Sequence, residues 1–102
     1  MIRINLYIKF LSTIKSIVGR KELIIKVNSN HITLDNLINE LIYELGESFR
    51  ELIFNLEAKE INPEILIFVD SKEISSLQKL KTPLSDGNQI VFLSSIHGGF
   101  KM

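Results

Sequence analysis

The sequence contains no cysteine and no tryptophan, and only two prolines among its 102 residues. Without cysteine, the chain has no disulfide, no thiol nucleophile and no zinc–thiolate site. It also lacks net charge, because twelve Lys and Arg residues balance twelve Asp and Glu residues. No block of five or six like charges occurs. The basic patch of a dedicated nucleic-acid binder is therefore missing, and we expect no direct binding of nucleic acid.

Long hydrophobic runs are missing as well. The longest run, Ile65–Val69, has five residues, whereas a membrane span needs roughly 20. The first residues alternate in polarity and do not form a signal-peptide core. We therefore expect a cytoplasmic protein that does not enter a membrane. Its apolar content of 45%, mostly from 17 Ile and 14 Leu, is enough for the core of one small domain.

Two segments near the N-terminus have the pattern of β-strands. Every second residue is apolar in residues 2–10, which is typical of a strand with one buried face. Leu23–Val27 contains β-branched residues, and a turn at residues 19–21 would join the two strands as a hairpin. The intervening residues 11–19 are predicted to be a short helical turn or a packed loop that ends at Gly19.

The middle of the chain has helical periodicity. Apolar residues recur at spacings of three and four after Thr33, which predicts a helix with Thr33 as its N-cap and Gly46 as its end. The predicted buried stripe consists of Leu34, Leu37, Ile38, Leu41 and Leu45. A second helical stretch is predicted to end before Asn62, and its apolar face consists of Phe49, Leu52, Ile53 and Leu56.

The C-terminal half returns to strands. The unbroken run Ile65–Val69 predicts a central strand that is buried on both faces. Leu77 and Leu80 are expected to anchor a weakly patterned segment, a turn follows over residues 82–87, and residues 89–93 form the last strand. This order predicts an α+β fold, with a mixed sheet of four to five strands and a helix packed across one face.

Candidate catalytic groups are few. His31 and His97 are the only imidazoles, and neither has a nucleophile or a second ligand at a suitable spacing. The glutamates at helical spacing are predicted to form a solvated face, and no glycine-rich phosphate loop occurs. We therefore expect a protein that is not an enzyme and that holds neither a metal nor a cofactor.

The C-terminus is the most informative segment. Gly98 and Gly99 follow closely on the last predicted strand, and a pair of glycines forms a thin strand without side chains. Such a strand can enter a narrow channel and present a backbone carboxyl group to another protein. We predict a domain over residues 1–95 and a flexible tail over residues 96–102, although a tail without function has the same pattern.

One face of the predicted sheet is a candidate docking surface. If Ile90 and Phe92 fill the core, Val91 and Leu93 lie on the outer face of the sheet. Tyr7 lies on the same face, because its neighbours in the first strand point to the core. An exposed apolar surface beside a tail indicates partner docking. The alternative is that another element covers this face.

Together these segments resemble the β-grasp sulfur carriers related to ubiquitin. That family includes the small subunit of molybdopterin synthase (MoaD), the thiamine-pathway carrier (ThiS) and the archaeal small modifiers. The resemblance spans nearly the whole chain and is most specific in Asn62–Asp70, in Thr82–Leu93 and in Gly98-Gly99, six residues beyond Leu93.

The resemblance implies a function for the glycine pair. A ubiquitin-activating-type enzyme would adenylate the carboxylate of Gly99, and sulfur transfer would then give a thiocarboxylate. The sulfur would go to a molybdopterin precursor, a thiazole precursor or a tRNA. A lysine could instead attack the activated carbonyl and form an isopeptide bond. The implied partners are the adenylating enzyme and either the large subunit of molybdopterin synthase or target-protein lysines. The family's contact face corresponds to Tyr7, Val91 and Leu93.

The chain departs from the family at its end. The carriers usually stop at the second glycine, but here Phe100-Lys101-Met102 follow. Because Gly99 then carries an amide, activation requires a protease that cuts between Gly99 and Phe100. Ser94-Ser95 also replaces the prolines that often precede the tail. If no protease cuts here, the protein is a non-activated interaction module that uses only the Tyr7/Val91/Leu93 face.

Overall fold

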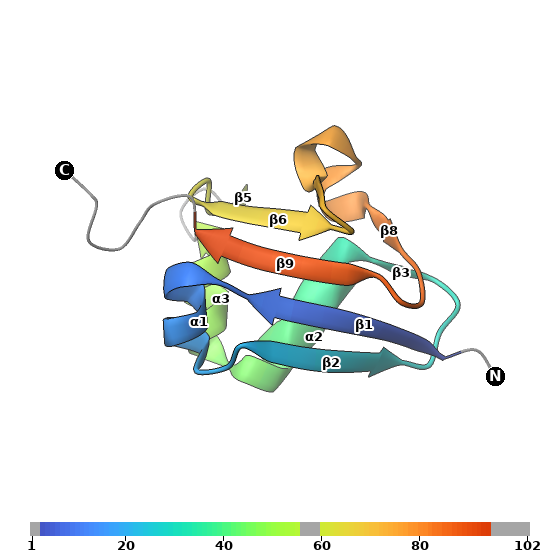
Figure 1. Cartoon of the computed structure of the whole chain (residues 1–102), viewed down its shortest axis with the longest axis horizontal. Coiled ribbons are helices and arrows are strands. Elements are labelled where there is room, and N and C mark those ends of the chain that lie inside the picture. The colour runs from blue at the N-terminus through green and yellow to red at the C-terminus, as the bar shows by residue number, and fades with distance from the viewer. Residues whose placement is uncertain (1–2, 56–59, 95–102) are drawn as a thin grey trace.

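The computed structural model describes residues 3–55 and 60–94. Figure 1 shows a sheet with the helices gathered behind it and at one end. The helices are α1 (Ser12–Val18), α2 (Leu34–Leu45) and α3 (Glu47–Ile53), with 3-10 turns η1 (Ile74–Ser76) and η2 (Lys79–Lys81). The strands are β1 (Ile4–Phe10), β2 (Glu22–Val27), β3 (Ile32–Thr33), β4 (Phe54–Asn55), β5 (Glu60–Ile61), β6 (Ile65–Val69), β7 (Lys72–Glu73), β8 (Pro83–Leu84) and β9 (Gln89–Ser94).

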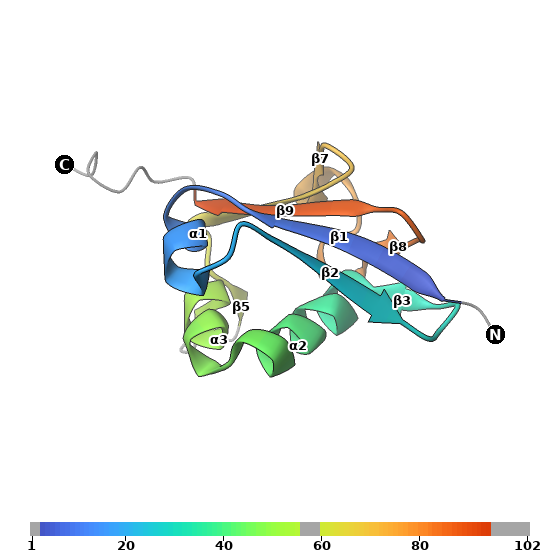
Figure 2. The same ribbon diagram turned by 60° about the horizontal axis from the view of Figure 1, so that its bottom comes forward.

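Five strands form one mixed sheet in the order β2-β1-β9-β6-β7. β1 and β2 form the predicted antiparallel hairpin, and β9 lies parallel to β1 and antiparallel to β6. The last strand therefore lies between the first strand and β6, which joins both ends of the chain into one sheet. Figure 2 shows α2 and α3 on one side of this sheet. The predicted α+β architecture, with four to five strands and a helix across one face, is confirmed.

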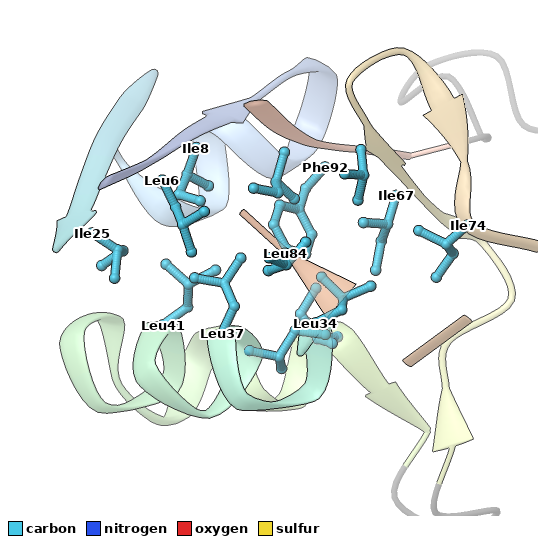
Figure 3. Close-up of a cluster of buried hydrophobic side chains, with 14 of the residues drawn as sticks. Leu6, Ile8, Ile25, Leu34, Leu37, Leu41, Ile67, Ile74, Leu84 and Phe92 are labelled. Atoms are coloured by element: carbon cyan, nitrogen blue, oxygen red, sulfur yellow. The ribbon is translucent and has the colours of Figure 1, made fainter. Parts of the chain in front are cut away.

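Helix α2 covers the inner face of the sheet. Its capping box forms as the backbone N–H of Thr33 donates to Asn36 Oδ1 at 3.0 Å. Gly46 ends the helix with a φ of +94°, a conformation that favours glycine. Leu37 and Leu41 point from α2 toward the side chains of the sheet (Figure 3) and are fully buried. The predicted stripe therefore packs as expected, except that Leu45 is only half-buried.

The second helical stretch is shorter than predicted. Helix α3 ends at Ile53, and Phe54 is already extended, with φ −105° and ψ 139°. Phe54 lies opposite Ile61 in a short β4–β5 ladder, so pairing between strands replaces helix where the sequence still has helical spacing. Leu56, which was assigned to the helical face, lies outside the described residues.

The prediction for residues 65–69 was confirmed in part. β6 is an interior strand of the sheet, between β9 and β7, but it is not buried on both faces. Ile65, Ile67 and Val69 are buried, but Leu66 and Phe68 are only half-buried. The helices cover one face of β6, and the other face stays open to solvent, so an unbroken apolar run does not here mean burial on both faces.

The segment between β7 and β9 also differs in detail. Ile74 is its buried anchor, whereas Leu77 and Leu80 pack half-buried against the core. Part of the predicted turn is a short strand, because Leu84 lies opposite Ile32 in the β3–β8 ladder. Thr82 is buried, and its hydroxyl donates to the carbonyl of Lys79 at 2.7 Å.

Candidate docking face and reactive terminus

The predicted docking residues lie together on the outer face of the sheet, which is the face opposite α2. Ile90 and Phe92 are fully buried on the inner side of β9, so Val91 and Leu93 point outward and are half-buried. Tyr7 points to the same side from β1 and is 43% exposed. The sequence therefore predicted the orientation of all three side chains correctly.

Three further apolar residues around Val91 and Leu93 on this face were not predicted. Leu66 lies opposite Leu93, and Phe68 lies opposite Val91, in the antiparallel β6–β9 ladder. Leu11 follows β1, and its backbone N–H donates to the carbonyl of Phe92 at 3.0 Å. The parallel β1–β9 register ends at Phe10 and Phe92, and the extended backbone of Leu11 (φ −121°, ψ 164°) continues the alternation of β1 onto the outer face. We call Leu11, Leu66, Phe68, Val91 and Leu93 the apolar patch. Leu66 and Phe68 were missed because their run was assigned to burial on both faces.

The apolar patch lies at the end of the sheet where β9 stops. Leu11 is 38% exposed, and the remaining four residues are half-buried. The structure describes β9 as far as Ser94, which directly follows Leu93 in the sequence. Gly98 and Gly99 follow the patch residue Leu93 within a few residues in the sequence. A partner that covers the patch therefore binds close to the glycine pair in the sequence.

An aromatic cluster beneath the patch anchors this end of β9. The ring of Phe92 stacks on Phe10 at a centroid distance of 5.8 Å and meets Phe49 edge-on at 5.9 Å. Phe10 and Phe49 also meet edge-on at 6.1 Å, and all three rings are buried. Such aromatic contacts stabilise beyond their buried area. The segment that leads to the tail is therefore fixed through Phe92.

The other end of β9 is fixed by a carboxylate. Asp70 accepts a hydrogen bond from the backbone N–H of Gln89 at 2.8 Å and another from Asn88 Nδ2 at 2.6 Å. Asp86 accepts from the backbone N–H of Asn5 at 2.7 Å. Gly87 has a φ of +90°, a conformation that favours glycine, so Asp86 and Gly87 suit the turn that was predicted over residues 82–87.

The predicted reactive terminus, Gly98, Gly99 and Phe100, lies outside the described residues, as does His97. The glycine pair, the cleavage position between Gly99 and Phe100, and the tail boundary at residue 96 therefore stay predictions.

Other candidate chemistry is sparse in the part of the chain that is described. Residues 3–55 and 60–94 contain no group of three or more potential metal ligands. Within the same ranges, no helix is long and apolar enough to cross a membrane. His31 is exposed, and its backbone N–H donates to Ser29 Oγ at 3.1 Å in a local turn.

One carboxyl group has a shifted titration. The pKa of Asp35 is lowered, first because the Thr33 hydroxyl donates a hydrogen bond to it and then because Lys81 Nζ bonds to it at 2.9 Å. Asp35 lies in the first turn of α2, on the helical side of the sheet. Its ionisation therefore concerns the stability of the fold and not the docking face.

The sheet order, the parallel pairing of its first and last strands and the helix across one face define a ubiquitin-like β-grasp protein. The sequence model of the Urm1 family, described as "ubiquitin related modifier", matches residues 5–99. Because this match covers nearly the whole chain, the protein belongs to the Urm1 family. The resemblance to ubiquitin-like carriers and modifiers is thereby confirmed. Proteins of this family are small carriers and not enzymes, in agreement with the prediction.

Three solved structures have the same fold. The small archaeal modifier protein 1 (SAMP1) of Methanosarcina acetivorans is similar with a TM-score of 0.77 at 18% identity, over 97% of this chain and 100% of that one. Urm1 of Trypanosoma brucei has a TM-score of 0.77 at 19% identity, over 97% and 99%. A putative molybdopterin converting factor, subunit 1, from Pyrococcus furiosus has a TM-score of 0.70 at 18% identity, over 91% and 99%. No curated protein sequence matches significantly.

Proposed function

We propose that this protein carries an activated acyl group at Gly99, as a sulfur carrier or a protein modifier, in the cytoplasm. The observation that supports the proposal best is the apolar patch, which lies at the end of β9 and thus within a few residues of the glycine pair. The match to the family also ends at residue 99, so Phe100-Lys101-Met102 fall beyond it. Both observations favour Gly99 as the residue whose carboxyl group is activated.

The first proposed step is removal of the last three residues. A protease hydrolyses the amide between Gly99 and Phe100, which consumes one water and leaves a free carboxylate on Gly99. Until that cut, the carbonyl of Gly99 is part of an amide and has no anionic oxygen to react with ATP. Glycine suits the position because the narrow channel of a partner enzyme would exclude a side chain.

The second step is activation by a ubiquitin-activating-type enzyme. A carboxylate oxygen of Gly99 attacks the α-phosphorus of ATP, an acyl adenylate forms and pyrophosphate leaves. A persulfide sulfur of a partner then displaces AMP, and a thiol reductant cleaves the S–S bond to leave a thiocarboxylate. Alternatively, the amine of a target lysine attacks the carbonyl of the acyl adenylate, which forms an isopeptide bond and releases AMP and a proton. The carrier supplies the carbonyl, and the partners supply the catalytic groups.

The apolar patch and Tyr7 are the proposed contact for the adenylating enzyme. Leu11 and Tyr7 are the exposed members, and burial of apolar surface is the main driving force of such contacts. A later acceptor, either the large subunit of molybdopterin synthase or a protein that bears target lysines, would use the same face after the enzyme dissociates. Because two partners cannot bind to this face together, transfer to the acceptor can follow only after the adenylating enzyme has dissociated.

An intact-mass experiment tests this proposal. The full chain and a protein that ends at Gly99 are each incubated with ATP and an extract of cells that thiolate a related carrier. We expect the full chain first to lose Phe-Lys-Met, and both proteins then to gain the mass of one sulfur in place of one oxygen. A protein ending at Gly99 with Gly99→Pro is the matched control and should stay unmodified.

The outcomes separate the two candidate functions. If the shortened protein is thiolated or conjugated but the full chain is not, the Gly99 chemistry holds and the extract lacks the protease. If neither protein changes while the related carrier is thiolated, the proposal fails. The protein would then be the interaction module that uses its outer face alone.

A further inference from the structure

The strand β2 forms an open edge of the sheet. Its backbone pairs with β1 alone, and the carbonyl of Lys21 accepts from the N–H of Phe10 at 2.9 Å. Because partners alternate along an antiparallel strand, the N–H and C=O groups of Glu22, Ile24 and Lys26 point away from β1. All three residues are exposed, and no strand in the described residues pairs with them there. Such an edge is a template for another strand.

The side chains along this edge are complementary to a reversed copy of themselves. On the outer face, Glu22, Ile24 and Lys26 follow one another at every second residue, so opposite charges lie at equal distances on either side of Ile24. Ile24 is 53% exposed and lies beside Tyr7 in the β1–β2 register. A strand with an acidic, an apolar and a basic residue in this order is complementary to a second copy that runs antiparallel to it.

We propose that two copies of this protein associate through their β2 edges, antiparallel and centred on Ile24. Ile24 then lies opposite Ile24 of the second copy, and Glu22 lies opposite Lys26 of the second copy on both sides of the two-fold axis. The three pairs are of the hydrogen-bonded kind, because their backbone groups already point outward. Opposite charges and apolar residues directly across a ladder each stabilise it.

Symmetry and the rest of the sheet limit the assembly to two copies. A two-fold interface requires a surface that is complementary to itself, which the β2 edge is. The other edge strand, β7, has only two residues, so it offers little for further growth. One strand edge is smaller than a standard interface of about 1,600 Å², and we expect a reversible dimer with a dissociation constant on the order of 100 μM.

The dimer leaves the apolar patch free. The patch lies on β6, β9 and the end of β1, whereas the contact involves the edge of β2. Tyr7, the remaining member of the proposed enzyme contact, lies beside Ile24 and thus next to the dimer. The chemistry at Gly99 does not require the dimer, and either proposal can fail without the other.

Charge reversal at the edge tests the dimer. Sedimentation equilibrium of the full chain from about 10 μM to 1 mM should show a monomer–dimer equilibrium. Glu22→Lys and Lys26→Glu each place like charges opposite each other at two positions, and each should weaken the dimer roughly tenfold or more. A mixture of the two variants should associate about as well as the unaltered protein, because each Lys then meets a Glu. Glu40→Lys, an exposed site on α2, is the charge-matched control and should leave association unchanged.

Several results would overturn the proposal. One is a monomer throughout the concentration range, which would leave the edge open for a different chain. Another is a dimer that Leu93→Asp abolishes but the edge variants do not, since the copies would then meet through the apolar patch. A third is a mixture of Glu22→Lys and Lys26→Glu that stays monomeric although thermal unfolding shows both variants folded.

Discussion

Phe68 of β6 lies directly opposite Val91 of β9, and both side chains are half-buried on the outer face of the sheet. Two residues further along β9, Leu93 lies opposite Leu66 on the same face. The ring of Phe92 packs with Phe10 and Phe49 beneath these pairs and anchors β9. The outer face at this end of β9 therefore has a fixed position. A partner that contacts it gains a defined position relative to the chain that follows Ser94.

Leu93→Asp should weaken binding of the adenylating enzyme by about tenfold or more, because a charge would be placed in the centre of an apolar contact. Leu93 is half-buried on the outer face, so the free energy of unfolding should change by only about 1 kcal/mol. Titration calorimetry against the isolated enzyme measures the affinity. Tyr43→Asp is the control, since Tyr43 is 87% exposed on α2. Equal affinities for both variants would mean that the face is misassigned.

Phe92→Ala should destabilise the fold by about 3–5 kcal/mol, because it removes a buried ring that contacts two others. The ring packs with Phe10 and Phe49 at centroid distances of 5.8 and 5.9 Å. Urea unfolding followed by circular dichroism gives the free energy. Val91→Ala, next in the strand but on the outer face, should cost clearly less. Similar losses for the two variants would contradict the assignment of faces in β9.

Gly99→Ala, introduced in the protein that ends at residue 99, should slow adenylation without affecting folding. The reason is that a methyl group would enter the space through which the glycine pair is expected to thread. Release of pyrophosphate by the adenylating enzyme reports the rate, and thermal unfolding reports the fold. Ser85→Ala, an exposed site in the turn before β9, serves as the control. Unchanged pyrophosphate release would remove the steric reason for glycine at this position.

The lowered pKa of Asp35 makes stability depend on pH. Its carboxylate accepts from Thr33 and Lys81, so the folded state favours the charged form more than the unfolded state does. This contribution is fully present above the ordinary value of 3.8 and is lost as the pH falls through the lower pKa of the folded state.

Asp35→Asn tests that dependence. The variant should be less stable than the unaltered protein at pH 6, and the difference in urea midpoint should shrink as the pH falls below the ordinary value of 3.8. Asn39→Ala, an exposed change on the same helix, should give a difference that does not vary with pH. A constant difference for Asp35→Asn across this range would show that its ionised form is not what stabilises α2.

Much of the fold could be predicted from local patterns. The hairpin of β1 and β2, and helix α2 with its caps at Thr33 and Gly46, all follow from alternation, periodicity and capping residues. The β4–β5 ladder could not, because Phe54 continues a helical spacing and only its pairing with Ile61 makes it a strand. The position of β9 in the middle of the sheet depends on long-range pairing, which leaves no local pattern.

The residues of the candidate site were also predicted only in part. Alternation was enough to place Tyr7, Val91 and Leu93 on the outer face. Leu66 was missed because an unbroken apolar run does not reveal which of its faces a helix covers. Leu11 was missed because it belongs to the outer face only through the bond from its N–H to the carbonyl of Phe92. The lack of side chains at Gly98 and Gly99 indicated a strand that can enter a narrow channel, whereas their adenylation and thiocarboxylation came from resemblance to a family.

The proposed chemistry at Gly99 is tested most directly by the identity of the C-terminal residue of the protein in its own cells. The protein is isolated under denaturing conditions, digested, and its C-terminal peptide is identified by mass spectrometry. If the carboxyl group of Gly99 is the reactive group, the C-terminal peptides end at Gly99, and a fraction of them bear a thiocarboxylate or an isopeptide-linked lysine. A C-terminal peptide that ends only at Met102, in growing and in stressed cells alike, would contradict the proposed chemistry.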